Sequence, residues 1–218
     1  MRTFPRNAFT MMELIIVIII MGILAALALP RMNDDRLQEA ADQILSHLRY
    51  TQHLAMMDNV FDPEDSNWYK KRIQLLIYHD GSGDKHLIYT IYSDKDEDEN
   101  TPPKVEEIFK DPLSQKLLIG DNNYNKHWER LDLTGQYGID NIQVCGTNHI
   151  LTTSNTGNSQ HIFFDSLGRP YHLDATNKMD GIFGNLIRKP CDIVFKSGKK
   201  KFTIIIQPIT GTVQVKWD

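Results

Sequence analysis

The sequence carries none of the short motifs by which the common enzyme classes are identified. It contains no P-loop, no H-E-x-x-H zinc motif, no G-x-S-x-G nucleophile motif and no glycine pattern for a dinucleotide. Its eight histidines are scattered, and no two of them stand four residues apart, as two metal ligands on one helix face would. These absences exclude the catalytic classes that such motifs define, and we predict that the chain is not an enzyme.

Cysteine is also scarce. The two cysteines, Cys145 and Cys191, belong to no C-x-x-C or Cys/His spacing, which argues against a redox or zinc site. The chain has 218 residues and a net charge of −4, so it has room for one apolar segment and one compact domain, but not for a second full domain.

An apolar run over residues 9–29 is the most distinctive feature that is present. Its 21 residues include a single carboxylate, Glu13. As a helix the run would be about 32 Å long, enough to cross a bilayer. No A-x-A cleavage site follows it, so we expect the run to be kept rather than discarded as a secretory signal. The eight residues before it carry Arg2 and Arg6, which predicts a cytoplasmic amino terminus and an exported remainder.

The start of this run resembles the type IV prepilin (class III) signal. That signal joins a short basic leader and a small residue to Phe-Thr-x-x-Glu at the start of an apolar helix, and residues 8–13 read A-F-T-M-M-E. Ala8 stands where Gly is more usual. The resemblance implies that prepilin peptidase cuts between Ala8 and Phe9 and methylates the new amino group of Phe9.

Glu13 admits two interpretations. A carboxylate inside a membrane helix costs about 3 kcal/mol, so it normally has a partner. Near a helix end it can reach the interface or become protonated, which requires no special role. The resemblance instead implies an assembly role, in which Glu13 pairs with the positive amine of Phe9 on a neighbouring subunit.

Residues 30–59 are expected to continue the helix with a different character. One apolar stripe repeats at spacings of three and four among polar residues, which is typical of a helix lying on a sheet. The stripe consists of Leu37, Ala41, Ile44, Leu48 and Ala55. We therefore predict one long helix from residue 9 to about residue 58, kinked at Pro30.

Residues 60–218 change to a strand pattern. Two β-rich runs joined by a Gly-rich turn over residues 80–84 predict a hairpin. The predicted strands cover residues 72–78, 85–92, 115–119, 141–145, 161–164, 192–195, 201–207 and 211–216. The fold class is therefore α+β, with a long kinked amino-terminal helix packed on an antiparallel β-sheet domain. The expected organisation is a leader (1–8), a transmembrane helix (9–29), its amphipathic continuation (30–59) and a periplasmic or extracellular β-rich domain (60–218).

Three later segments resemble FimT/GspH-type minor pilins and pseudopilins: residues 44–57, 162–169 and 202–211. This resemblance implies a minor subunit near the tip of a type II secretion pseudopilus or a type IV pilus. The implied partners are other pilins, prepilin peptidase and the inner-membrane assembly platform. The implied location is the bacterial inner membrane, with a single span and a periplasmic domain, and then the filament at the cell surface. Much of residues 60–160 resembles nothing in the family.

An exported domain would place Cys145 and Cys191 in an oxidising compartment. A disulfide between them would close a loop of 46 residues. Such a loop stabilises the fold by about 4 kcal/mol in the chain-entropy estimate. Two buried free thiols remain the alternative.

Two charged segments suggest ligands. Asp94, Asp96 and Asp98 alternate as calcium-binding carboxylates do, although the segment departs from the EF-hand pattern, and a solvated loop is the simpler interpretation. We expect no other cofactor. The carboxyl-terminal part carries seven Lys and Arg against two Asp between residues 186 and 218.

The candidates for DNA contact in this basic part are Lys196, Lys199, Lys200 and Lys201. Such a cluster can hold phosphates without reading sequence. The family resemblance includes DNA receptors for natural transformation, which makes DNA uptake the alternative function. A lysine-rich turn that keeps an edge hairpin soluble is the structural interpretation.

Overall fold

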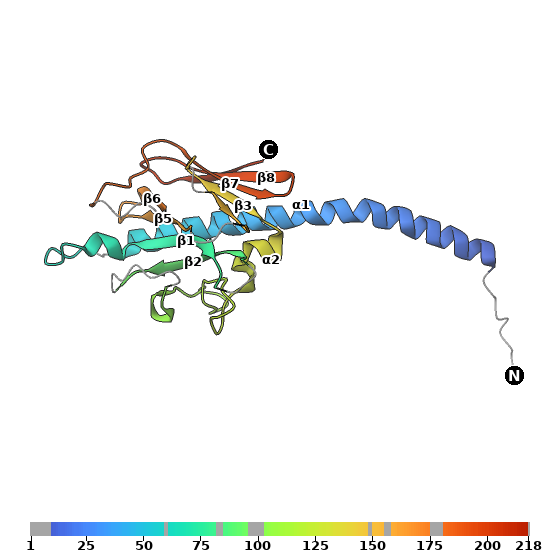
Figure 1. Cartoon of the computed structure of the whole chain (residues 1–218), viewed down its shortest axis with the longest axis horizontal. Helices are drawn as coiled ribbons and strands as arrows, with labels where there is room; N and C mark the ends of the chain where they lie inside the picture. The colour runs from blue at the N-terminus through green and yellow to red at the C-terminus, as the bar shows by residue number, and fades with distance from the viewer. Residues whose placement is uncertain are drawn as a thin grey trace. The chain divides into compact units, whose positions relative to one another are not determined.

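The computed structural model describes residues 10–58, 61–81, 85–95, 103–147, 150–154, 158–174 and 181–217, with the side chains of residues 26–35 and 174 left out. The chain divides into two compact units, residues 1–38 and residues 39–218 (Figure 1). The first unit contains the start of helix α1, and the second is a folded domain. The boundary falls inside α1, so each unit is treated by itself.

Helix α1 runs without interruption from Met11 to Met57, over 47 residues. The long helix predicted from residue 9 to about residue 58 is therefore present. The kink predicted at Pro30 is not shown and stays a prediction. Across the described residues, the structure has no helix whose length and hydropathy suffice for a membrane span. The span predicted over residues 9–29 is therefore not confirmed.

The domain contains two antiparallel sheets, which confirms the α+β class. The first has the order β2-β1-β5-β6. Its strands are β1 (Ile73–His79), β2 (Leu87–Ser93), β5 (Gln160–Phe164) and β6 (Pro170–Asp174). The second has the order β4-β3-β7-β8-β9. Its strands are β3 (Asn141–Val144), β4 (Leu151–Thr152), β7 (Cys191–Ser197), β8 (Lys200–Ile206) and β9 (Val213–Trp217).

The strand predicted over residues 115–119 is wrong. This segment makes only isolated bridges, from Leu117 to Lys110 and from Ile119 to Thr90. Gln115 has φ 58°, a left-handed conformation that interrupts an extended strand. Strand β6 has no predicted counterpart, because its first residue, Pro170, lacks a backbone N–H and reads as a turn residue.

From residue 39 onward, the predicted stripe of α1 lies in the core of the domain. Its buried positions, together with those beside it, are Ala40, Ala41, Ile44, His47, Leu48, Thr51 and Ala55, all 0–8% exposed. Strand β1 is buried from Ile73 to Tyr78 on both of its faces. A strand covered on both faces reads as a nearly continuous apolar run rather than an alternating one, and residues 73–78 are apolar except for the buried Gln74.

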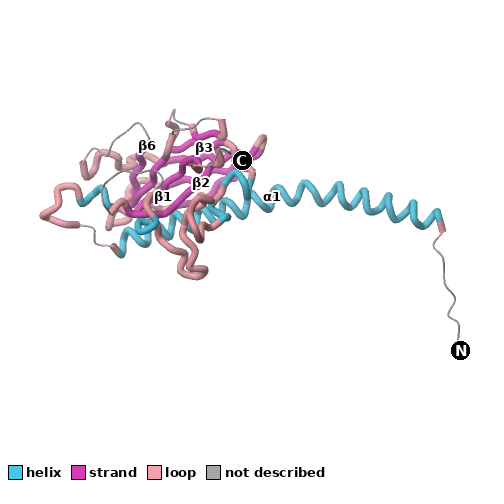
Figure 2. Tube along the Cα trace, turned by 60° about the horizontal axis from the view of Figure 1, so that its bottom comes forward, coloured by secondary structure: helices cyan, strands magenta, loops and turns pink. Residues whose placement is uncertain are grey.

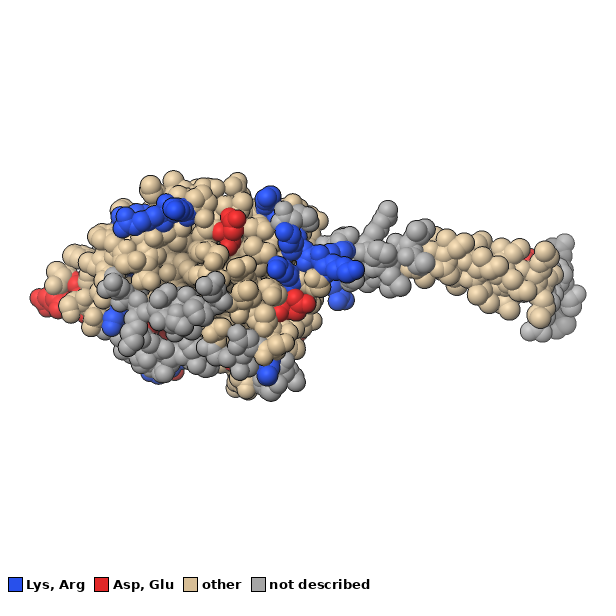
Figure 3. Space-filling model, turned by 45° about the horizontal axis from the view of Figure 1, so that its top comes forward, with Lys and Arg blue, Asp and Glu red and all other residues tan. Residues whose placement is uncertain are grey.

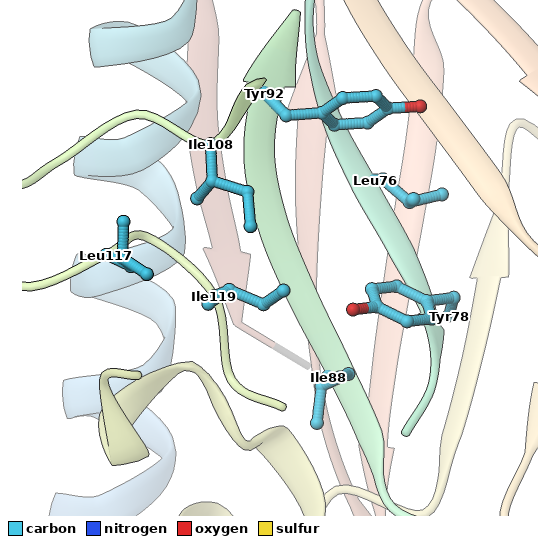
Figure 4. Packing of buried hydrophobic residues seen from close by; sticks show 7 residues of the cluster. All are labelled: Leu76, Tyr78, Ile88, Tyr92, Ile108, Leu117 and Ile119. Atoms are coloured by element: carbon cyan, nitrogen blue, oxygen red, sulfur yellow. The ribbon is translucent and has the colours of Figure 1, made fainter. Parts of the chain in front are cut away.

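The chain between β2 and β3 covers one face of the first sheet. Its described residues are mainly loop, and they include the short helices η2 (Val105–Glu107), η3 (Glu129–Leu131) and α2 (Leu133–Tyr137). Another short helix, η1 (Trp68–Lys71), precedes β1. Figure 2 distinguishes the helices, strands and loops by colour. Ile108, Leu117 and Ile119 from this loop pack into one buried cluster with side chains of β1 and β2 (Figure 4). The strand members of the cluster are Leu76, Tyr78, Ile88 and Tyr92. Residues 105–119 therefore act as a third layer of the domain.

Candidate functional site

The first turn of α1 is closed by Thr10 and Glu13. Oε2 of Glu13 accepts hydrogen bonds from the backbone N–H and from Oγ1 of Thr10, each at 2.9 Å. In return, the backbone N–H of Glu13 donates to Oγ1 of Thr10 at 3.3 Å. This reciprocal arrangement is a capping box, which satisfies amide groups left unpaired at a helix start. The T-x-x-E pattern, which is part of the processing signal, is also the sequence signature of a capping box.

The predicted cleavage residues, Ala8 and Phe9, lie outside the described residues, so the structure does not test them. The helix that follows presents large apolar side chains in every direction. From Met11 to Leu24 these side chains are between 45% and 80% exposed. Glu13 is the only charged side chain between residues 10 and 25. An apolar surface of this kind marks a site of contact with lipid or with other proteins.

In the domain, α1 is held on the first sheet by a polar network around Tyr89. Nε2 of Gln43 donates to the hydroxyl of Tyr89 at 2.8 Å and to the carbonyl of Arg130 at 2.7 Å. The hydroxyl of Tyr137 donates to Oε1 of Gln43 at 3.1 Å. Nδ1 of His47 lies 2.8 Å from the hydroxyl of Tyr89. Because the network needs one register of α1 against the sheet, it fixes the helix both along its axis and in rotation.

His47 is buried beside Tyr89 and Trp128, with ring centroids 5.7 Å from each. Burial lowers the pKa of His47 from its ordinary value near 6.5 to about 4, and the charge of Asp111 opposes this shift. The side chain is therefore neutral at physiological pH. A neutral, hydrogen-bonded histidine in a helix–sheet interface has a structural role.

Gln52 connects α1 to turns of both sheets. Its Nε2 donates to the carbonyls of Gly168 and Thr210, at 2.9 Å each. Gly168 lies in the turn between β5 and β6, and Thr210 lies in the turn between β8 and β9. The turns touch directly, because a Cβ at Gly211 would lie 2.4 Å from the Gly168 carbonyl oxygen. Gly211 also has φ 64°, so both space and backbone require glycine here.

Cys145 and Cys191 form a disulfide in the structure, with Cα atoms 4.5 Å apart. Cys191 opens β7, and Cys145 follows β3, which is paired with β7. The backbone N–H of Cys145 also donates to the carbonyl of Asp192 at 2.9 Å. The bond therefore fastens the end of β3 to the start of β7.

The basic carboxyl-terminal segment separates into two groups. We call Lys196, Lys199, Lys200 and Lys201 the lysine hairpin, because they surround the turn between β7 and β8, where Lys196 lies opposite Lys201. Arg188 and Lys189 precede the other end of β7. Figure 3 likewise shows separate groups of Lys and Arg side chains on the visible face. The four predicted DNA-contact lysines are thus together, while DNA contact itself is untested and stays a prediction.

Only one of the three calcium candidates lies among the described residues. Asp94 is buried directly after β2, while Asp96 and Asp98 lie outside the described residues. Within the described ranges, no group of three or more His, Cys, Asp or Glu side chains could hold a metal ion. Calcium binding therefore stays a prediction without structural support.

Comparison with known proteins identifies the amino-terminal segment. Residues 4–29 match a family described as the prokaryotic N-terminal methylation motif. No curated protein and no solved structure matches the chain. The match contains Ala8, Phe9 and Glu13, and it supports a type IV pilin-like precursor that prepilin peptidase processes and that assembles with other pilins.

Proposed function

We propose that this chain is a minor pilin or pseudopilin. Prepilin peptidase removes residues 1–8, and the amino-terminal helix then assembles the subunit into a type II secretion pseudopilus or a type IV pilus, near the filament tip. Before assembly the subunit is anchored in the bacterial inner membrane by this helix, with the domain on the periplasmic side.

The observation that carries the proposal is the surface of α1 between Met11 and Leu24. Its large apolar side chains are all 45–80% exposed, and the methylation motif over residues 4–29 covers the same segment. A bilayer before assembly and neighbouring helices after it are the two environments that would bury such a surface. A helix needed only for the fold of its own domain would bury one face against that domain.

In the proposed mechanism, the capping box prepares Glu13 for assembly. The two bonds from Thr10 hold the carboxylate at the helix start, next to the backbone N–H of residue 10. Cleavage after Ala8 would create a positive amine on Phe9, one residue before Thr10. A neighbouring subunit's amine could then reach a carboxylate that is already oriented, and pairing with it offsets the cost of a charge among apolar helices.

The folded domain would supply a rigid body at the end of this helix. The network around Tyr89 and the two hydrogen bonds donated by Gln52 hold α1 against both sheets. The disulfide suits the oxidising periplasm. These features support an exported, compact subunit.

Mass spectrometry of the chain purified from bacterial membranes tests the processing step. We expect loss of residues 1–8 and a methylated Phe9. An uncleaved amino terminus would overturn the proposal and favour an ordinary single-span sensor or adhesin.

A Glu13→Leu variant tests the assembly step. We expect it to be cleaved but excluded from sheared filaments. Glu129→Leu serves as the matched control, since Glu129 is an exposed glutamate of the domain, and it should assemble as the parent does. Normal assembly of Glu13→Leu would remove the role given to this carboxylate.

A further inference from the structure

The lysine hairpin concentrates positive charge at one edge of the domain. Strands β7 and β8 pair Ser197 with Lys200 and Lys196 with Lys201, so the loop between them is Gly198-Lys199. Gly198 has φ 59°, which suits a tight two-residue hairpin turn. Asp140 is a nearby acid, and its Oδ2 accepts a bond from the backbone N–H of Gly198 at 3.2 Å. Four of the six residues from Lys196 to Lys201 are lysines, which gives this turn a high formal positive charge.

A half-exposed tryptophan accompanies these lysines. Trp217 pairs with Phe202, the residue after Lys201, and the two rings lie 5.6 Å apart. Trp217 is 49% exposed. Lys216, also exposed, precedes it, and Asp218 follows in the sequence. Tryptophan next to lysine is typical of surfaces at a membrane–water interface, where the ring lies at the level of the headgroups and the amines contact phosphates.

The hairpin lies at the end of the domain where α1 enters. A Cβ at Gly138 would lie 3.3 Å from Oγ of Ser197, and the adjacent Tyr137 bonds to Gln43 of α1. Gln43 is four residues from Glu39, the first residue of the domain. The apolar run ends at Leu29, ten residues before Glu39. In the sequence, therefore, only a short segment separates this end of the domain from the apolar run.

We propose that the lysine hairpin and Trp217 form a docking surface for the anionic lipid headgroups of the membrane that anchors the subunit before assembly. The inference rests on the proposed function for its membrane anchor. Each lysine close to an anionic membrane surface strengthens binding by about fivefold. The attraction decays within about 10 Å at 0.1 M salt, so it acts only when the domain lies against the headgroups. Docking would hold a free subunit in one orientation, and transfer into a filament would release it.

The test uses the full-length chain reconstituted in vesicles of phosphatidylcholine alone or with 30% phosphatidylglycerol. Acylation of lysine amines is followed by mass spectrometry at 0.1 M and 1 M NaCl. We expect Lys199 and Lys200 to react at least threefold more slowly with phosphatidylglycerol present, and only at low salt. Brominated lipids should quench the fluorescence of Trp217. The contribution of Trp217 is identified as the fluorescence that is lost in the Trp217→Phe variant.

Charge reversal supplies a matched pair of variants. Lys199→Glu/Lys200→Glu should abolish the lipid-dependent quenching of Trp217. Arg188→Glu/Lys189→Glu reverses the same number of charges at the other end of β7 and should leave the quenching unchanged. Equal loss in both variants would mean that net charge, not the lysine hairpin, attracts the lipid, and would overturn the proposal.

Two further outcomes are decisive. Acylation rates that do not depend on phosphatidylglycerol overturn the docking surface, and protection of Lys199 and Lys200 by duplex DNA in vesicles without anionic lipid would assign the hairpin to DNA instead. Loss of residues 1–8, measured on the same samples, reports the proposed function separately. Correct processing without lipid dependence removes only this inference, whereas lipid dependence with an uncleaved chain removes the pilin assignment.

Discussion

The two ends of α1 are apolar for different reasons. Between Met11 and Leu24 the apolar side chains cover the whole helix and are 45–80% exposed. Between Ala40 and Ala55 one stripe of residues, which includes His47 and Thr51, is at most 8% exposed, and the residues on the other faces are half-buried or exposed. The second part is stabilised by its own domain, while the first requires an environment that a single folded chain does not provide. Substitutions in the two parts should therefore be read out by different measurements, assembly for the first and unfolding for the second.

The disulfide gives the largest expected effect and lies wholly in the domain. Replacing both cysteines, Cys145→Ser/Cys191→Ser, should lower the free energy of unfolding by about 4 kcal/mol, because a cross-link closing 46 residues no longer restricts the unfolded chain. Urea denaturation of the chain in detergent measures this loss. Cleavage after Ala8 should be unaffected, so a processing defect in a folded variant would contradict the separation of the two parts.

Shortening one aliphatic side chain in each part of α1 compares the two parts most directly. Leu48 is fully buried, and Leu48→Ala should cost about 3 kcal/mol of domain stability by leaving a cavity. Ile18 is 60% exposed, and Ile18→Ala should change the same unfolding free energy by less than about 0.5 kcal/mol. Equal effects in the urea midpoint would show that the amino-terminal part is packed into the domain after all.

Acid should weaken the domain through His47. Its pKa is about 4 when folded and about 6.5 when unfolded, so the unfolded chain binds more protons between these values. The contribution of neutral His47 is complete above pH 6.5 and is lost as pH falls toward 4, by about 3 kcal/mol for a pKa difference of this size. Urea midpoints measured from pH 7.5 to 4.5 should show this decline, and His47→Gln should flatten it. An unchanged slope in His47→Gln would assign the decline to other groups, such as His161, whose pKa burial also lowers to about 4.

Removing the two hydrogen bonds that Gln52 donates to the turns should have the smallest effect on the free energy of unfolding. Gln52→Ala removes the donor to the carbonyls of Gly168 and Thr210 and should cost about 1.5 kcal/mol. Faster amide exchange in the turns around residues 165–168 and 208–211 should accompany it. Gln38→Ala, on the same helix outside the domain, is the matched control, and an equal loss of stability there would show that the effect is one of helix propensity.

Local signals in the sequence were sufficient for the helix and for several strands. The predicted strands 201–207 and 211–216 correspond to β8 and β9 because Pro208 and Gly211 mark the turn between them. The division into two sheets was not predictable in this way. Strand β1 pairs with β5, far along the chain, and such pairing depends on the assembled core rather than on local residues.

The candidate site was predictable only in its amino-terminal part. Residues 8–13 form a contiguous motif, so the sequence alone is enough to find it. The family match over residues 4–29 includes this motif. The Gln43–Tyr89 bond could not be inferred, because it depends on the rotation of α1 against a sheet formed 46 residues later. The capping partner of Glu13 was within reach of sequence reasoning, since Thr10 stands three residues before it.

The side chains along α1 that bond to the domain also define how the subunit would bear tension. Gln43 bonds to the first sheet, Arg49 donates to the carbonyl of Val213 on the second at 3.2 Å, and Gln52 bonds to one turn of each. A pull along the helix axis is consequently shared among attachment points spread over about 14 Å of helix. Neither sheet carries the whole load. In a filament built from such subunits, the domain should therefore stay attached to α1 under tension.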